Sequence, residues 1–442
     1  MLTLFTDATI VTMDGERKVL REAALVVRGD QIDWLGGMAD IPLVYQSAVK
    51  ISAKDKVLFP GFVNLHTHAG LSILRGIADD KGLSPAYSPK VPQGVFLSPD
   101  EIYLYTQLGA LEALRFGTTT IVDNYIYSDR TVVALDELGL RAVVSERLHD
   151  ADLFQIPNGV YQFDERLGEE LLNRNIDLVR NWQGHGNGRI TCRIGTHAPD
   201  TCSTTYLEKA RDTANKFGLG LVIHLAQSPR EQQEIINRSG KRVVHYLNDL
   251  ALLGPQMIAG HCVFLDDDEM DLLAKSGTQV AHLSGSNAKA GKKAPVNELM
   301  ARGMNIGLGS DNMSGDMVEA MRMALCIARL RTDNNQALRA MQVLEMATIN
   351  GAKALGMEDK IGSLEVGKKA DLIVVDTLQP HWTPLIDPVA NLVHGGLGTD
   401  ISLVMVDGSI LMEDGVVKTV DTKMVLQQAQ KTAVELWRKI TN

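Results

Sequence analysis

Short apolar runs that alternate with longer helical patterns are the feature of this sequence that most constrains its fold. Strands that alternate with helices build parallel sheets. Eight such runs predict a (β/α)₈ barrel, and a doubly wound open sheet is the structural alternative. The runs span residues 56–68, 118–125, 141–148, 190–199, 220–227, 257–263, 278–286 and 305–312.

Helix start and stop signals in the intervening segments support this alternation. Ser98 can cap a helix whose first residue is Pro99, and Glu101 completes a capping box. An acidic run that begins at Asp266 opens a second predicted helix, and Gly277 is its stop signal. The sequence therefore predicts helices between the strands.

Both ends of the chain carry a different pattern, in which short β-rich segments are separated by glycine-containing turn signals. We expect the two ends to join in one small β-sandwich. The predicted division is residues 1–57 for the first part of the sandwich, 58–358 for the barrel, and 359–442 for the second part with a terminal helix.

Length, charge and cysteine content exclude several classes of protein. The chain has 442 residues, which suits one large domain and a smaller one. Its net charge of −10, without a long basic run, argues against nucleic-acid binding. Neither a signal-peptide pattern nor an apolar stretch of the ~18 residues needed for a membrane span is present. Four cysteines without a C-x-x-C pair are typical of a reduced, cytoplasmic protein.

Five side chains that can bind a metal stand at the ends of predicted strands, where barrel enzymes collect their catalytic groups. His66 and His68 form H-x-H, and side chains two residues apart on a strand point to the same side. His224 ends the fifth strand, His261 the sixth and Asp311 the eighth. An isolated H-x-H arises readily by chance, but the whole set at strand ends does not.

This mixture of imidazoles and one carboxylate suits Zn²⁺ or Fe²⁺ and leaves a coordination position for water. Such an ion lowers the pKa of the water to about 7. Asp311 can touch the ion and take the proton of the water, while His261 either hydrogen-bonds the hydroxide or is itself a ligand. The fourth strand, 190–199, has no lysine at its end that could bridge two ions, which favours a single metal.

The motifs PGFVNLHTH, GTTTIVD, THAPDTCS, IHLAQ, AGHCV, LSGSNAK and GLGSDN follow one another along the chain. Together they resemble the amidohydrolase superfamily, in its branch of S-adenosylhomocysteine/methylthioadenosine deaminases, guanine deaminases and triazine hydrolases. The resemblance covers nearly the whole chain. It implies a distorted (β/α)₈ barrel with a small β-sandwich built from both termini.

The resemblance also implies hydrolytic displacement at a C–N bond, often of an amino group on a nitrogen heterocycle. His261 would then assist the attacking water. One divalent metal is implied, most simply Zn²⁺, with Fe²⁺ as the alternative. Its ligands would be His66, His68, His224 and Asp311.

Three further residues are implied to bind the substrate. His197, in THAPDTCS, would contact it in the pocket, although it is otherwise read as a hydrogen-bonded histidine at a strand end. Ser284 and Asn287, in LSGSNAK, would form a polar wall at the end of the seventh strand. For these two residues the alternative is simple loop capping.

Gln227 departs from the family pattern, because the deaminases usually carry a glutamate three residues after the histidine of the fifth strand. That glutamate moves a proton onto the ring, whereas glutamine cannot exchange a proton at useful pH. Three explanations are open: Gln227 acts only through hydrogen bonds while Asp311 transfers every proton, the substrate needs no ring protonation, or another acid enters the pocket. Asp200 is a candidate for that acid, and Glu231 is expected to be a solvated helix residue.

A second departure follows the first strand, where residues 82–97 are rich in proline and glycine and lack tryptophan. We expect a loop that covers the pocket, or else an ordinary surface connection. As a pocket cover it would place S-adenosylhomocysteine and methylthioadenosine in doubt as substrates.

The sequence thus predicts a single-metal hydrolase that displaces an amino or substituted amino group from a small nitrogen heterocycle, such as a triazine, a pterin or a purine-like ring. The catalytic residues would be His261, Asp311 and Gln227, and Gln227 would also contact the substrate. One alternative is hydrolysis of a cyclic amide or a carbon–halogen bond, and another is a non-catalytic binding protein on the same scaffold. The expected partners are a small-molecule substrate and further copies of the chain, as is common in this family, with no nucleic acid and no membrane.

Overall fold

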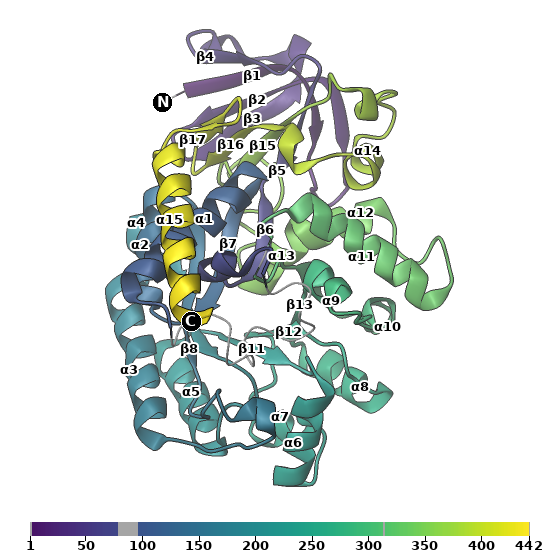
Figure 1. Ribbon diagram of the computed structural model, residues 1–442. Coiled ribbons are helices and arrows are strands. Elements are labelled where there is room, and N and C mark those ends of the chain that lie inside the picture. Colours follow the sequence, from purple (N-terminus) through teal and green to yellow (C-terminus); the bar gives the residue numbers. More distant parts are fainter. Residues whose placement is uncertain (1, 78–95, 313, 442) are drawn as a thin grey trace.

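The barrel occupies the middle of the chain (Figure 1). The computed structural model describes residues 2–77, 96–312 and 314–441. Within these residues, parallel strands pair in the order β14-β13-β12-β11-β10-β8-β7-β6, and β9 also pairs with β8. These are β6 (Phe62–Thr67), β7 (Thr118–Tyr125), β8 (Arg141–Leu148), β9 (Ile190–Cys192), β10 (Ile194–Thr196), β11 (Leu221–Leu225), β12 (Met257–His261), β13 (Gln279–His282) and β14 (Ile306–Leu308).

The closure of the barrel brings its first and last strands together just beyond their ends. A parallel bridge joins Thr67 to Asp311. The amide of His68 donates to the carbonyl oxygen of Asp311 at 2.9 Å, and the amide of Asp311 donates to that of His66 at 3.0 Å. The predicted closed barrel is therefore confirmed over the open sheet, and its seam lies beside the H-x-H motif.

Two of the predicted runs divide into two strands each. The run 56–68 separates into β5 (Lys56–Pro60) and β6, and β5 joins the terminal sheet. Gly61 marks the division, because a Cβ atom there would lie 2.1 Å from the side chain of Thr119. The run 190–199 similarly holds the short strands β9 and β10. Contacts with distant residues set these interruptions, so the apolar pattern alone did not reveal them.

Helices surround the barrel, and their predicted ends are confirmed where capping signals were present. Ser98 caps α1 in a complete capping box, and Asp266 with Glu269 does the same for α8, which ends at Gly277. The helices are α1 (Pro99–Arg115), α2 (Ser128–Leu138), α3 (Glu165–Trp182), α4 (His185–Gly188), α5 (Thr204–Phe217), α6 (Pro229–Ser239), α7 (Val243–Asp249), α8 (Asp267–Ser276), α9 (Ser284–Lys289), α10 (Val296–Ala301), α11 (Met317–Thr332), α12 (Ala340–Ala347), α13 (Ile349–Leu355), α14 (Pro388–His394) and α15 (Thr422–Thr441).

A second sheet combines strands from both termini, as predicted (Figure 1). Its order is β18-β17-β16-β15-β5-β1-β2-β3, and β4 pairs with β1. One apolar core joins its two halves, with Phe5 and Leu25 from the first part and Leu372 and Met405 from the second. The remaining strands are β1 (Leu2–Val11), β2 (Val19–Arg28), β3 (Gln31–Gly37), β4 (Val49–Ser52), β15 (Leu372–Asp376), β16 (Ile401–Val406), β17 (Ser409–Glu413) and β18 (Val416–Val417).

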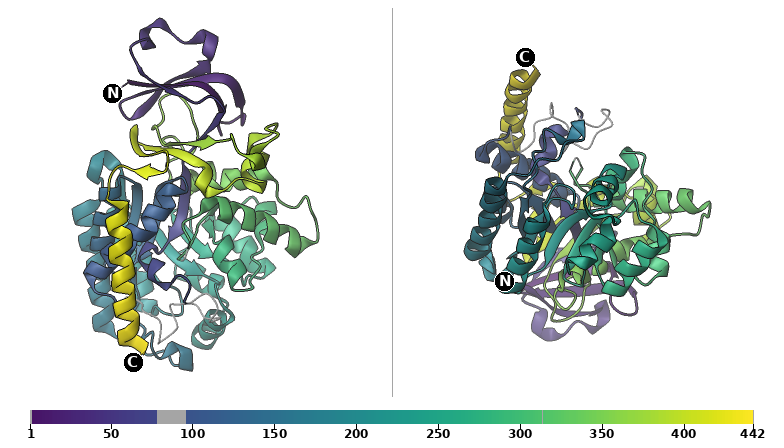
Figure 2. Two further views of the ribbon diagram at one scale, coloured as in Figure 1. Left: turned by 45° about the horizontal axis from the view of Figure 1, so that its top comes forward. Right: turned by 90° about the horizontal axis from the view of Figure 1, so that it is seen from below.

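The terminal helix α15 lies along the barrel (Figure 2). It packs against α1, where Ala429 and Leu436 share an apolar cluster with Ile102 and Tyr105. The hydroxyl of Tyr105 donates to the carbonyl oxygen of Ala429 at 3.1 Å. Among the helices described, none has the length and apolar character that a membrane crossing requires. The exact division at residues 57/58 and 358/359 stays a prediction.

Candidate metal centre and active site

His66 and His68 are placed by hydrogen bonds beneath the loop that follows β6. Asp123, at the end of β7, accepts hydrogen bonds from the hydroxyl of Thr67 at 2.9 Å and from the amide of Ala69 at 2.7 Å. Burial raises the pKa of Asp123 to about 6. This carboxyl group binds the residues on either side of His68. The backbone at this point therefore sets the direction of the His66 and His68 imidazoles.

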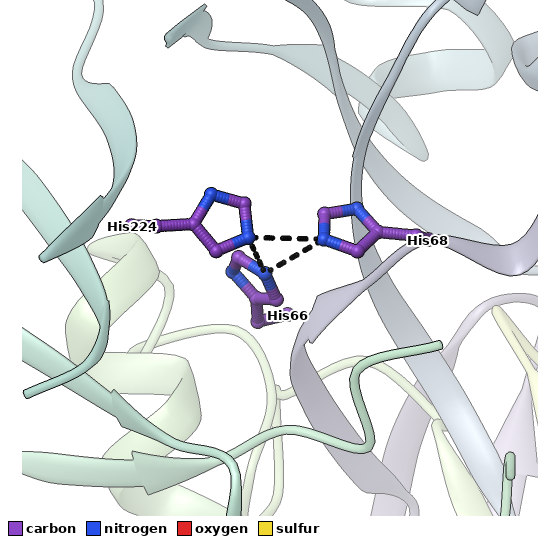
Figure 3. Close-up of side chains that lie close together, drawn as sticks. All are labelled: His66, His68 and His224. Atoms are coloured by element: carbon purple, nitrogen blue, oxygen red, sulfur yellow. Dashed lines mark hydrogen bonds between the residues drawn. The ribbon is translucent and has the colours of Figure 1, made fainter. Parts of the chain in front are cut away.

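Three imidazoles meet at one point at the carboxyl end of the barrel (Figure 3). The Nε2 atoms of His66 and His68 lie 3.3 Å apart, those of His66 and His224 3.1 Å, and those of His68 and His224 3.0 Å. Ligand nitrogens held about 2.0–2.1 Å from a tetrahedral zinc ion lie roughly 3.3 Å from one another. The observed spacing therefore suits a single ion.

Backbone carbonyls fix the protonation of two of these rings. The Nδ1 of His68 lies 2.7 Å from the carbonyl oxygen of Asn124, and the Nδ1 of His224 lies 2.6 Å from that of His197. Because a carbonyl can only accept, each Nδ1 carries the proton and each Nε2 presents a lone pair. Lone pairs that face one another repel, and a shared cation removes that repulsion. The donor set fits a divalent metal.

Burial favours the neutral form of these rings, which is the form that binds a metal. Burial, reinforced by the neighbouring histidines, places the pKa of His66 and of His68 well below the usual value. Burial likewise lowers the pKa of His224 to about 3. All three side chains are therefore ready as ligands at neutral pH.

Asp311 lies beside this cluster. Its Oδ1 is 3.6 Å from the Nε2 of His68, and burial raises the pKa of its carboxyl group. The backbone of Asp311 has a φ of 66°, in the left-handed region. His261 and Ala226 share that conformation, with φ of 72° and 50°. Backbone strain of this kind collects at functional sites, and here it marks three strand ends around the cluster.

His261 faces the cluster from β12. Its ring centroid lies 5.4 Å from that of His224, and its Nδ1 is 2.9 Å from the Oδ1 of Asn287. The amide oxygen of Asn287 accepts the Nδ1 proton, which leaves the Nε2 of His261 as an acceptor. Burial lowers the pKa of His261 to about 4, so its ring is neutral near pH 7.

The structure places the other predicted substrate-binding residues at different distances from the centre. The ring of His197 lies 5.3 Å from that of His224, and its Nδ1 is 2.9 Å from the hydroxyl of Thr201. Asn287 reaches the site through His261. The hydroxyl of Ser284 donates to the carbonyl oxygen of Ala320 in α11 at 2.6 Å, which ties it to the neighbouring helix.

Gln227 is buried in the turn after β11, and Glu231 lies directly behind it. The expectation that Glu231 is solvated was wrong, because its side chain is fully buried and accepts hydrogen bonds from the amides of Ala226 and Gln227. Asp200 is also buried, and its Oδ2 accepts the hydroxyl of Tyr161 at 3.1 Å. The second departure from the family pattern is the segment 82–97. Residues 82–95 of this segment lie outside the described part of the chain.

Sequence reasoning missed two cationic residues near the centre. Arg147, at the end of β8, is only 3% exposed, and its guanidinium stacks on Tyr125 at 4.5 Å. The Nε of this guanidinium is fully buried and has no hydrogen-bond partner in the part of the chain that is described here. Lys292 donates to the carbonyl oxygen of Gln227 at 2.8 Å. The sequence did place Arg147 near the end of a predicted strand, where barrel enzymes collect their functional residues, and this signal could have identified it.

A cavity of about 720 Å³ lies on the β8 side of the centre. His149 lines it, and the ring of His149 is 6.2 Å from that of His197. The loop between β8 and α3 supplies apolar walls such as Leu153 and Phe154, and α3 adds Arg174. The cavity has the size of a small-molecule site and a mixture of apolar and charged walls.

Comparisons with known proteins agree with this architecture. A model of the amidohydrolase family matches residues 57–411. The 5'-deoxyadenosine deaminase of Methanosarcina mazei is 37% identical over 99% of both chains. The 5-methylthioadenosine/S-adenosylhomocysteine deaminase of Moorella thermoacetica is 39% identical over 97% of this chain and 98% of its own.

Two solved structures extend the comparison. An adenosine deaminase from Xanthomonas campestris with bound zinc is 27% identical, with a TM-score of 0.88 over 99% of this chain and 98% of the other. The atrazine chlorohydrolase TrzN from Arthrobacter aurescens, complexed with zinc, shares the fold at 22% identity, with a TM-score of 0.86 over 98% of this chain and all of its own.

Proposed function

The chain belongs to the amidohydrolase family, and we propose that it is a single-metal deaminase of an aminopurine-type ring. Action on a heterocycle through a metal-dependent hydrolysis follows from the family and from the histidine cluster. The ring system and the roles of individual residues are the proposal. Its main support is the convergence of three imidazole Nε2 atoms, two of which, on His68 and His224, present lone pairs to each other.

The proposed ligands are His66, His68, His224 and Asp311. Zinc is the first candidate, since both solved structures compared above contain it, and iron is the alternative. When bound, the ion would supply a Lewis acid that makes hydroxide available near pH 7.

The surrounding side chains divide the remaining tasks. Asp311, whose pKa burial raises, would accept the proton of the water and return it to the departing amine. The Nε2 of His261 would accept a hydrogen bond from the attacking water, because Asn287 holds the proton on its Nδ1. Gln227 would donate a hydrogen bond to the ring, and His197 would contact the substrate from the neighbouring strand.

The names of the relatives favour an adenosine-type substrate over a triazine. They are deaminases of 5'-deoxyadenosine and of 5-methylthioadenosine/S-adenosylhomocysteine. The cavity of about 720 Å³ beside His149 has room for a substituent attached to the ring. Arg147, buried without a hydrogen-bond partner among the described residues, would bind an acceptor group of that substituent.

A panel assay tests this proposal. The zinc-loaded protein would be given 5'-deoxyadenosine, methylthioadenosine, S-adenosylhomocysteine, a free aminopurine, an aminopterin ring and an aminotriazine, and released ammonia would be measured. Fastest turnover of a nucleoside is the expected result. Ammonia release only from the triazine would overturn the ring assignment, and no release from any compound would overturn deamination. Mass spectrometry of the products would reveal halide loss or ring opening.

We also propose that the protein is cytoplasmic and forms homo-oligomers. All four cysteines are free thiols, and three of them are buried. Helix α15 exposes Met424, Leu426 and Val434, which would suit contact with another copy. Light scattering at several protein concentrations measures the oligomeric state, and a monomer at all of them would contradict this part.

A further inference from the structure

Ionisable side chains from two different elements hold the backbone of Gln227 on both sides. Its amide donates to the Oε2 of Glu231 at 2.7 Å, and its carbonyl oxygen accepts from the Nζ of Lys292 at 2.8 Å. The preceding amide, of Ala226, donates to the Oε1 of Glu231 at 2.8 Å. The two peptide groups that flank Gln227 are thereby fixed in direction.

Glu231 does more here than cap a helix. The cap of α6 is already provided by Ser228, whose hydroxyl accepts the amide of Glu231 at 3.1 Å. The carboxylate of Glu231 instead reaches back to Ala226 and Gln227, although complete burial of a carboxylate is costly unless hydrogen bonds compensate it. Ala226 has a φ of 50°, so the turn is strained and needs such support.

Lys292 comes from the turn after α9, the helix whose Asn287 contacts the proposed catalytic histidine. The amide of Lys292 donates to the carbonyl oxygen of Asn287 at 2.8 Å, and the side chain of Asn287 binds His261. Helix α9 and the turn after it therefore hold His261 and Gln227, through Asn287 and Lys292 respectively. The adjacent Lys293 is exposed to solvent, whereas the side chain of Lys292 is partly buried to reach a neutral carbonyl.

We propose that Glu231 and Lys292 are positioning residues that lock the Gln227 backbone so that its side-chain amide meets the substrate ring in one orientation. This inference rests on the proposed function. A carboxylic acid can transfer a proton, but an amide contributes only a hydrogen bond, whose strength falls steeply with misalignment. Fixed geometry is therefore worth more for glutamine at this position than for the usual glutamate. The matching substrate presents a ring nitrogen acceptor next to the carbon that bears the amino group.

The decisive comparison is Lys292→Met against Lys293→Met in the full-length, zinc-loaded protein. Misplacement of a group by about 1 Å can cost 10²-fold, so Lys292→Met is expected to lower kcat by about tenfold or more while KM changes little. Lys292→Arg, which keeps a charged donor, should recover most of the loss. The exposed Lys293→Met should match the wild type. Equal kcat for Lys292→Met and Lys293→Met would overturn the proposal.

A double-variant test separates positioning from general destabilisation. In a Gln227→Ala background there is no side-chain amide to aim, so Lys292→Met should cause no further loss of kcat. If Lys292→Met lowers kcat by the same factor in the wild-type and the Gln227→Ala backgrounds, Lys292 does not act through Gln227 and the proposal is overturned. Glu231→Gln, which keeps the shape but leaves one amide of the pair without its acceptor, replaces Lys292→Met if that variant does not fold.

Hydrogen exchange provides a readout that needs no substrate. Peptides that contain Ala226 and Gln227 should exchange faster in Lys292→Met than in Lys293→Met, while exchange in the preceding strand β11 is unchanged. Unchanged exchange at these amides would overturn the positioning role whatever the activity. If the wild type releases no ammonia but exchange does increase, the proposed function fails and the structural lock stands.

Discussion

The two ends of β8 carry two buried arginines with opposite surroundings. Arg141 begins the strand and donates to both carboxylate oxygens of Asp371, at 2.8 and 3.1 Å, and also to Asp407. Arg147 lies near the other end, and the Nε of its guanidinium has no hydrogen-bond partner within the described chain. The first end faces the terminal sheet, and the second faces the histidine cluster.

This difference extends to the whole barrel. At the amino end, Arg141 is paired with Asp371 and Asp407, and Arg193 donates to the carbonyl oxygens of Gln256 and Ala354, as expected where a barrel serves stability. At the carboxyl end the structure leaves the Nε of Arg147 without a hydrogen-bond partner, lone pairs of His68 and His224 that face each other, and left-handed backbone at Asp311. These arrangements cost free energy in the absence of a ligand. The molecule thus stores unfavourable interactions where substrate and metal would relieve them.

The largest expected effect is the loss of a proposed metal ligand. His224→Ala should lower kcat/KM by about 10³-fold or more, as removal of an essential catalytic group does. Metal content by elemental analysis should fall from about one ion per chain. Chelation of the wild type should reproduce the loss and added zinc should reverse it. Retention of full activity without metal would contradict the proposed centre.

Arg141→Met tests the stability end of the comparison. Removal of one partner of a buried ion pair costs about 3–5 kcal/mol, because Asp371 would stay buried without its partner. The free energy of unfolding, measured with urea, should fall by that amount. KM should not change, since the pair lies at the opposite end of the barrel from the histidines. An altered KM with unaltered stability would reverse the roles of the two ends.

Arg147→Met is the matched change at the functional end of the same strand. Because this guanidinium stacks on Tyr125 but its Nε has no hydrogen-bond partner in the described chain, the free energy of unfolding should fall by no more than about 2 kcal/mol. Substrate affinity should fall about 10- to 100-fold, the value of hydrogen bonds from a charged donor. Calorimetry with S-adenosylhomocysteine and with the free aminopurine should show a loss for the nucleoside alone. Strong destabilisation without loss of affinity would show that Arg147 is structural.

The sequence predicted the features that depend on local pattern. Strands β7 and β8 match their predicted bounds, because apolar residues persist through the whole of each strand. The H-x-H motif and His224 were recognisable because strand ends meet at one edge of a barrel. Whether each proposed ligand and substrate contact performs its assigned role remains a prediction.

Features that depend on distant contacts were not readable from the sequence. The division at Gly61 arises from the close approach of Thr119, which is 58 positions further along the chain. Glu231 looked like a surface residue because only the turn geometry of Ala226 brings two amides to it. Lys292 and Gln227 are 65 residues apart, and no local pattern links them.

The last expected effect is a pH dependence that originates at Asp123, beneath the H-x-H loop. Burial raises its pKa to about 6 in the folded protein, above about 3.9 in the unfolded chain. The folded state therefore binds the proton more tightly, so this contribution to stability is present below about pH 4 and is lost as the pH rises through 6. The shift corresponds to about 2–3 kcal/mol. Asp123→Asn should remove this dependence, and urea unfolding of the metal-free protein between pH 4 and 7 measures it. If the free energy of unfolding changes with pH by the same amount in the wild type and in Asp123→Asn, Asp123 is ionised in the folded protein. The carboxyl end of the barrel then stores less unfavourable free energy than the comparison of the two ends implies.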